Sequence, residues 1–148
     1  EVVSGGLPVD LGPHDALRIH QLKPLKSADL SFSQVVDHGG MPLNEAIQKE
    51  RTGKLLEIFR ELQPDLLVTE LFPFGRRRFR FELLPLLDAA RAGKTPVICS
   101  VRDSVQQRSE EREKEAIAWL RQYYAKVLVH GDERFMPVNA SSRGSCRR

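Results

Sequence analysis

The chain has 148 residues, of which 41% are hydrophobic, and a formal net charge of +3. This length and apolar content suit one domain with a sizeable core. The three arginines within residues 138–148 account for the whole excess of positive charge, so the rest of the chain is neutral. A neutral body argues against a general nucleic-acid-binding protein, which normally carries a broad basic face.

The two cysteines, Cys99 and Cys146, lie far apart and lack the paired spacing of a disulfide framework or a zinc site. This pattern predicts a reduced, cytoplasmic protein. The apolar runs are far too short for a transmembrane segment. The opening "EVVSGG" has neither the charged start nor the apolar centre of a signal peptide. It reads instead as the end of a strand, which predicts a chain cut from something longer.

The first half of the chain predicts two strands and one long helix. Residues 1–6 form a short apolar run closed by glycines, and residues 16–22 predict a second strand. Residues 23–42, with two prolines and "HGG", predict a long ordered connection. Apolar residues then recur at helical spacing over residues 43–62, and Pro64 ends that helix.

The second half predicts alternating strands and helices. "DLLVTE" (residues 65–70) is a buried strand, and the helix after it is closed by Gly93, with Pro85 near its first turn or at a kink. "TPVICSV" is a further apolar strand, and Ser109 is the expected N-cap of a helix that reaches about residue 124. "KVLVHGD" (residues 126–132) is the last strand.

These strands are apolar throughout, which predicts burial on both of their faces. The chain is therefore expected to be an α/β protein, with a Rossmann-like parallel sheet and helices on both faces. Residues 138–148 show no apolar periodicity and predict a disordered basic tail.

Ligands of open parallel sheets bind at the carboxyl ends of the strands, so the polar residues there are the candidates for a site. These residues are Thr69, Glu70, Ser100, Arg102, Asp103, His130, Gly131 and Asp132. Each has an alternative role. Arg102 and Asp103 can pair with each other or cap the next helix, and His130 can be an ordinary strand-end histidine. A partly buried Glu70 needs a ligand hydroxyl or an arginine as its partner.

The segment "FPFGRRRF" places Arg76, Arg77 and Arg78 where a strand passes into a helix. Arginines oppose the positive end of a helix dipole, so we expect them to face an anion such as a phosphate. The alternative is a surface cluster whose phenylalanines pack into the core. The sequence contains no GxGxxG motif, P-loop, HExxH or GxSxG, so we expect no cofactor and no metal.

The stretches "PDLLVTELFPFGRRRFRFELLPLLDAAR", "TPVICSVRDSV" and "YYAKVLVHGDERFMP" resemble predicted glycosyltransferases of GT-B architecture. These are related to glycosyltransferase family 28, which includes the enzyme that adds N-acetylglucosamine to the lipid-linked peptidoglycan precursor. The resemblance covers most of residues 1–137. It implies an amino-terminal Rossmann-like half that holds the acceptor, with its first strand and glycine–histidine loop absent and the donor-binding half absent.

The resemblance implies a role in sugar transfer from a nucleotide-sugar donor, which the missing half would bind, to an acceptor that bears hydroxyl or phosphate groups. The implied acceptor-binding residues are Glu70, Arg76, Arg77, Arg78, Arg102, Asp103, His130 and Asp132. Glu70 is the candidate catalytic residue, and the catalytic base is not assigned. A lipid-linked acceptor at the inner membrane face would suit the neighbouring phenylalanines. The fragment alone is expected to be inactive.

Two alternatives to a transferase stay open. The first is a nonenzymatic α/β module that holds an anionic partner, a phosphorylated ligand or RNA, through the arginine-rich loop. The second is a nucleotide-binding Rossmann enzyme of another type.

Overall fold

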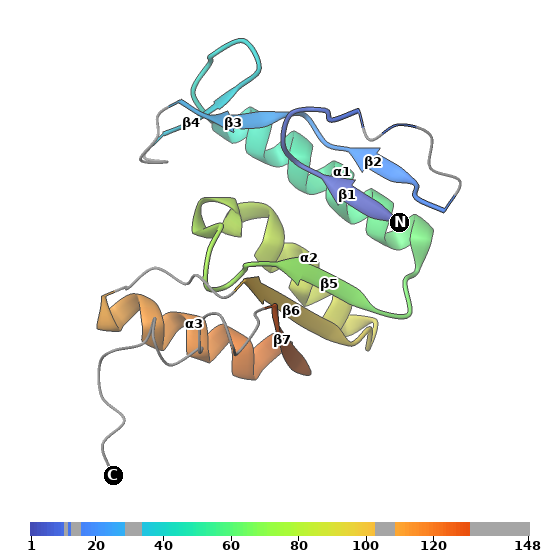
Figure 1. The fold of residues 1–148 in the computed structure, drawn as a ribbon, viewed down its shortest axis with the longest axis vertical. Helices are drawn as coiled ribbons and strands as arrows, with labels where there is room; N and C mark the ends of the chain where they lie inside the picture. Colours follow the sequence, from blue (N-terminus) through green and yellow to red (C-terminus); the bar gives the residue numbers. More distant parts are fainter. Residues whose placement is uncertain (11, 13–15, 29–33, 103–108, 131–148) are drawn as a thin grey trace. The chain divides into compact units, whose positions relative to one another are not determined.

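A computed structural model describes residues 1–10, 12, 16–28, 34–102 and 109–130 (Figure 1). The predictions for Asp103, Asp132 and the tail at 138–148 lie outside these residues. The chain divides into two compact units, which are described separately. The first comprises residues 1–63 and 81–86, and the second comprises residues 64–80 and 87–148.

The first unit contains two small sheets. Strand β1 (Val2–Ser4) pairs in parallel with β2 (Ile19–Gln21), which confirms the first two predicted strands. Strands β3 (Leu25–Ser27) and β4 (Val35–Asp37) form an antiparallel pair within the expected connection at 23–42. Each of these strands has only three residues, and the prolines and glycines around them indicated a connection and not strands.

Helix α1 (Glu45–Leu62) is the long helix of this unit. It begins at Asn44, whose side chain accepts a hydrogen bond from the Ile47 N–H at 3.0 Å. It ends at Gln63, which adopts a left-handed conformation with φ of 43°. One stripe of the helix is buried, and it consists of Ile47, Arg51, Leu55 and Ile58. The helix therefore packs an arginine among its apolar residues.

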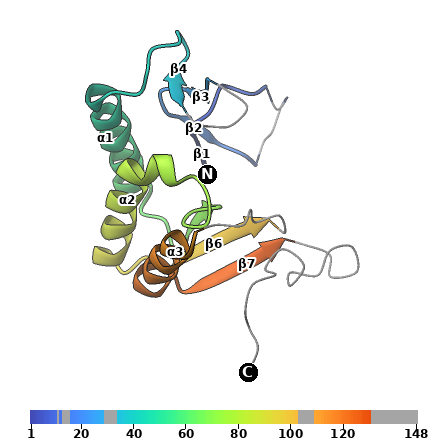
Figure 2. The ribbon, with the colours of Figure 1, turned by 90° about the vertical axis from the view of Figure 1, so that its left-hand side faces the viewer.

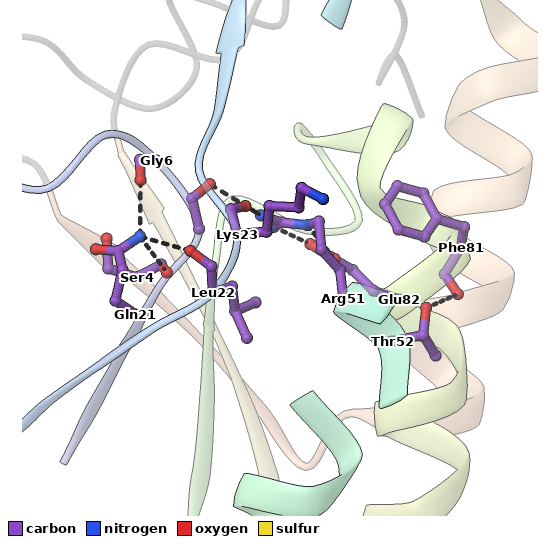
Figure 3. Close-up of polar contacts among 10 residues, drawn as sticks. Ser4, Gly6, Gln21, Leu22, Lys23, Arg51, Thr52, Phe81 and Glu82 are labelled. Atoms are coloured by element: carbon purple, nitrogen blue, oxygen red, sulfur yellow. Dashed lines mark hydrogen bonds and ion pairs between the residues drawn. The ribbon is translucent and has the colours of Figure 1, made fainter. Parts of the chain in front are cut away.

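Arg51 is only 1% exposed, and its guanidinium is fully engaged (Figure 3). Two of its nitrogens lie 2.8 Å from the carboxylate oxygens of Glu82, on helix α2 (Arg80–Ala92). It also donates hydrogen bonds to the backbone carbonyls of Gly5 and Lys23. A Cβ at Gly5 would lie 2.6 Å from an Arg51 nitrogen, so this close approach requires glycine. The buried ion pair thus fastens the exits of β1 and β2 to α1.

Pro85 lies inside α2, in its second turn, and not in the first turn. A proline has no N–H, so the carbonyl of residue 81 loses its helical hydrogen bond. The hydroxyl of Thr52, on α1, donates to the Phe81 carbonyl at 3.3 Å (Figure 3). Thr52 therefore supplies the donor that Pro85 lacks.

The second unit is built on three parallel strands in the order β5–β6–β7. Their bounds are Leu67–Glu70, Val97–Arg102 and Lys126–His130. Strands and helices alternate along the chain: α2 connects β5 to β6, and α3 (Glu110–Tyr123) connects β6 to β7. This arrangement confirms an α/β fold with a parallel sheet.

One face of this sheet is covered by α3 and the end of α2 (Figure 2). The Tyr124 hydroxyl lies 2.9 Å from the Thr69 hydroxyl of β5, and Tyr123 donates to Asp88 of α2 at 2.8 Å. The buried residues of these strands and helices are Thr69, Leu87, Ala90, Val97, Cys99, Val101 and Ala116. Side chains alternate along a strand, so Val68 and Leu128 point to the opposite face, where they are 52% and 45% exposed. The prediction that these strands are buried on both faces is therefore wrong, because α2 and α3 cover one face of the described sheet.

The ends of the helices depart from the sequence prediction in detail. Gly93 does cap α2, but with φ of −79°, and the left-handed residue is Lys94, with φ of 58°. Ser109 occupies the N-cap position of α3, yet its side chain makes no capping hydrogen bond within the described residues. Among the helices of the described ranges, none is long and apolar enough to cross a membrane.

Candidate functional site

The segment that follows β5 is anchored by Phe72. Its side chain is 0% exposed, and its ring stacks on Trp119 of α3 with 5.3 Å between the centroids. Three side chains lie within hydrogen-bond distance of its carbonyl: Thr69 at 3.2 Å, Tyr124 at 3.0 Å and the Cys99 thiol at 3.1 Å. This phenylalanine therefore serves the fold, as one of the two sequence-based alternatives proposed.

The thiol and the phenol around this anchor are held neutral. Burial raises the pKa of Cys99 to about 11, and burial also raises the pKa of the Tyr124 hydroxyl. Desolvation disfavours the charged form of each group. Cys99 is thus a protonated core residue at neutral pH and not a nucleophile.

Two residues beside the anchor adopt left-handed backbone conformations, Leu71 with φ of 62° and Arg76 with φ of 52°. The Phe72–Pro73 peptide between them is cis. A left-handed non-glycine residue costs about 1–2 kcal/mol and persists where its surroundings fix it. The buried Phe72 provides such surroundings, and the Arg76 guanidinium comes to lie 2.8 Å from the Glu70 carboxylate.

The three consecutive arginines have different partners. Arg76 pairs with Glu70, and this pair is exposed. Arg77 pairs with Glu115 of α3 and lies over the Trp119 ring, with its guanidinium carbon 5.1 Å from the ring centroid. Arg78 is exposed and has no ion-pair partner among the described residues. Of the three predicted anion contacts, Arg78 is therefore the one left available.

Positive charge is nonetheless concentrated at the start of α2. The pKa of Arg77 is lowered, first by burial and then by the neighbouring charges of Arg112 and Arg80. Arg77 also donates a hydrogen bond to the Arg112 carbonyl at 3.5 Å, which places the first turn of α3 beside this cluster. The guanidinium groups of Arg80 and Arg112 therefore lie close enough to Arg77 to act on its charge.

Glu70, Ser100 and His130 lie at the carboxyl ends of the three parallel strands. Glu70 is directly opposite Ser100 in the register of β5 and β6, so both side chains share one face of the sheet. The Ser100 Oγ lies 2.8 Å from His130 Nε2. Arg102 is placed opposite His130 by the register of β6 and β7. The structure thus brings the predicted Glu70 and His130 to one sheet edge.

Glu70 differs from its prediction in burial. Its side chain is 43% exposed, not partly buried between apolar neighbours. Its exposure follows from its position on the face opposite the helices, which the alternation from the buried Thr69 requires. The expectation of an arginine partner is confirmed by the contact with Arg76.

Ser100 is the site residue that the sequence-based set of acceptor contacts missed. It stands two residues before the end of β6 and pairs with Leu128 in the strand register, so only the side-chain geometry reveals that its hydroxyl meets His130. Within the described part of the chain, no group of three or more His, Cys, Asp or Glu side chains is arranged to hold a metal ion.

A shallow hollow of about 450 Å³ lies on the first unit, along α1. It is lined by Glu45, Gln48, Lys49, Thr52, Gly53, Leu56 and Phe81. None of the predicted site residues is among them. The sheet edge is the better candidate because its carboxylate, hydroxyl and imidazole are arranged where parallel sheets bind ligands.

No family model, curated protein or solved structure matches this chain.

Proposed function

We propose that this chain forms the acceptor side of a glycosyltransferase of GT-B architecture, with a Rossmann-like sheet that further strands and helices complete. The observation that supports the proposal is the meeting of Glu70, Ser100 and His130 at the carboxyl edge of three parallel strands. A carboxylate, a hydroxyl and an imidazole are side chains that exchange hydrogen bonds readily with the hydroxyls of a sugar.

The ion pair of Glu70 and Arg76 suits a ligand contact. Both side chains are more than two-fifths exposed, at 43% and 48%. Exposed ion pairs contribute only about 0–1 kcal/mol, so an acceptor can displace one at little cost. In this proposal Glu70 accepts a hydrogen bond from the acceptor and is the candidate catalytic residue. Arg78 contacts an acceptor phosphate, which would suit a lipid-linked acceptor at the inner face of the membrane.

Catalysis by such an enzyme needs donor and acceptor held together. We therefore expect the 148-residue chain alone to transfer no sugar. Incubation with uridine-diphosphate sugars and a panel of hydroxyl-bearing acceptors should release no nucleotide above a buffer control. Steady turnover by this chain would contradict the proposal that the donor is bound elsewhere.

The positive test uses a protein that carries this sequence together with a donor-binding half. Arg78→Gln should raise the KM for acceptor at least severalfold, because a charge-assisted hydrogen bond is worth about 1.5–3 kcal/mol. The KM for donor and the melting temperature should stay unchanged. Glu70→Gln should lower kcat more than either KM if the carboxylate acts in the transition state. Normal kinetics in both variants would refute the acceptor assignment.

Arg77→Gln is the matched control for Arg78→Gln. Arg77 is bound to Glu115 and Trp119 within the second unit. Its replacement should lower the melting temperature and leave the KM for acceptor less affected. A loss of acceptor affinity confined to Arg77→Gln would reverse the roles given to the two residues.

A second candidate is a nonenzymatic module that binds an anionic partner. The influence of Arg80 and Arg112 on Arg77 favours it, as does Arg78, which is exposed and has no ion-pair partner in the described part of the chain. The discriminating measurement is calorimetric titration of this chain with inorganic pyrophosphate and with a neutral glycoside. Tight, salt-sensitive binding of pyrophosphate that Arg78→Gln abolishes, without any response to glycosides, would favour the module.

A further inference from the structure

Ser100 and His130 meet on the face of the sheet that the helices leave open. Ser100 is half-buried in β6, and His130 is the exposed last residue of β7. Their hydrogen bond, at 2.8 Å, joins an exposed imidazole to a neighbouring strand. A hydrogen bond of this kind adds only about 1 kcal/mol to stability, so the fold depends little on it.

The tautomer of His130 depends on which partner donates the proton in this contact. A serine hydroxyl has one proton, and His130 Nε2 is the only side-chain partner of Ser100 within the described residues. When Ser100 donates this proton, Nε2 must be the unprotonated nitrogen and Nδ1 must carry the hydrogen. The basic lone pair of His130 is then held at the carboxyl edge of the sheet.

The position of this lone pair fits a ligand that lies across β6. Glu70 on β5 lies opposite Ser100 of the central strand, whereas His130 on β7 lies opposite Arg102, two residues further along β6. Adjacent strands are about 4.8 Å apart, so the outer two are separated by roughly 10 Å. This span leaves room for a hydroxyl-bearing ring between Glu70 and His130, with Ser100 beneath it.

Resting on the proposed function, we infer that His130 Nε2 accepts the proton of the acceptor hydroxyl and that Ser100 is a positioning residue, which keeps Nε2 unprotonated until the acceptor replaces it. As the acceptor oxygen bonds to the anomeric carbon of a nucleoside-diphosphate sugar, the bond from that carbon to the phosphate oxygen breaks. The nucleotide leaves with the electron pair, and the acceptor proton passes to Nε2. Before the ligand binds, the Ser100 hydroxyl occupies the place of the acceptor hydroxyl.

The first test reads the tautomer of His130 in the 148-residue chain by ¹⁵N NMR. In the wild type we expect an unprotonated Nε2. Ser100→Ala should shift the ring toward the Nε2–H form, and Ser100→Thr, which keeps the hydroxyl, should restore the wild-type spectrum. His20, which contacts Glu1, is the internal control and should not change. A protonated Nε2 in the wild type, or no change in Ser100→Ala, would overturn the inference.

The second test titrates the same chain with methyl β-D-glucopyranoside, a neutral hydroxyl-bearing probe. We expect shifts in the amide of Glu70 and the ring of His130, and about a threefold to tenfold weaker affinity in His130→Gln. Because His130 is exposed at a strand end, this variant avoids any change within β6. Circular dichroism should confirm that it folds.

The two proposals fail in different ways. Shifts at Glu70 with none at His130, and unchanged affinity in His130→Gln, would overturn the role of His130 and leave the acceptor side intact. A glycoside that shifts neither residue would remove the acceptor assignment, and the role of His130 with it, whatever the tautomer.

Discussion

Replacing Phe72 with alanine tests whether the segment after β5 is held by its buried anchor. Phe72 is 0% exposed and stacks on Trp119. A buried Phe→Ala replacement costs about 3–5 kcal/mol, because the apolar contacts are lost and a cavity remains. The total stability of a domain is only about 5–15 kcal/mol. The variant should therefore lose a large part of its stability and show a much lower urea midpoint.

The assay is urea unfolding followed by the fluorescence of the single tryptophan, Trp119, which lies against the removed ring. Phe74→Ala is the matched control, since Phe74 is only half-buried in the same segment. We expect it to cost less than half as much as Phe72→Ala. Equal shifts of the two midpoints, or a negligible shift for Phe72→Ala, would show that the burial of Phe72 is not what holds this segment.

Three further predictions concern buried groups. Arg51→Met should lower the free energy of unfolding by about 3–5 kcal/mol, measured by urea unfolding and circular dichroism, because Glu82 stays buried without its partner. The double variant Arg51→Met/Glu82→Leu should recover part of this loss, and a cost typical of surface substitutions would contradict the prediction. Burial raises the Cys99 pKa from 9.0 to about 11, so the thiol ionises first in the unfolded state. The stability of the wild type relative to Cys99→Ser should therefore fall by up to about 3 kcal/mol between about pH 9 and pH 11, and a constant difference would refute the shift. Thr52→Val should lower the free energy of unfolding by about 1–3 kcal/mol, but it should have almost no effect in a Pro85→Ala background, where the alanine N–H can donate to the Phe81 carbonyl. Equal losses of stability in both backgrounds would refute this coupling.

The elements predicted correctly are those whose apolar pattern is long or uniform. α1 and the three strands β5, β6 and β7 repeat the expected positions to within a few residues. β3 and β4 were not predicted because the two prolines and the "HGG" of residues 23–42 indicated a connection without strands. The capping role of Asn44 was also missed, although it precedes a helix that the pattern did predict.

The candidate site could be predicted only where topology decides it. Parallel strands bring their carboxyl ends to one edge, and this rule placed Glu70 and His130 together without knowledge of the register. The partners of the arginines were beyond such a rule. Arg76 has a left-handed backbone conformation, so its side chain and that of Arg77 point in different directions. The partner of Arg77 is Glu115, which is 38 residues further along the chain. Composition and spacing carry neither of these facts.

The contacts of the second unit differ in how easily a ligand can replace them. The Phe72 carbonyl, the Cys99 thiol and the Thr69 hydroxyl are buried and satisfy one another, so they hold the backbone in place. On the opposite face, Glu70 pairs with an exposed arginine, and His130 lies within hydrogen-bond distance of the Ser100 hydroxyl. Contacts of the second kind are weak because water competes for both partners. A ligand that offers a hydroxyl to His130 and Glu70 would replace them without disturbing the buried layer. A fixed support beneath exchangeable polar groups is what a binding edge requires, because binding then costs little ordering of the protein.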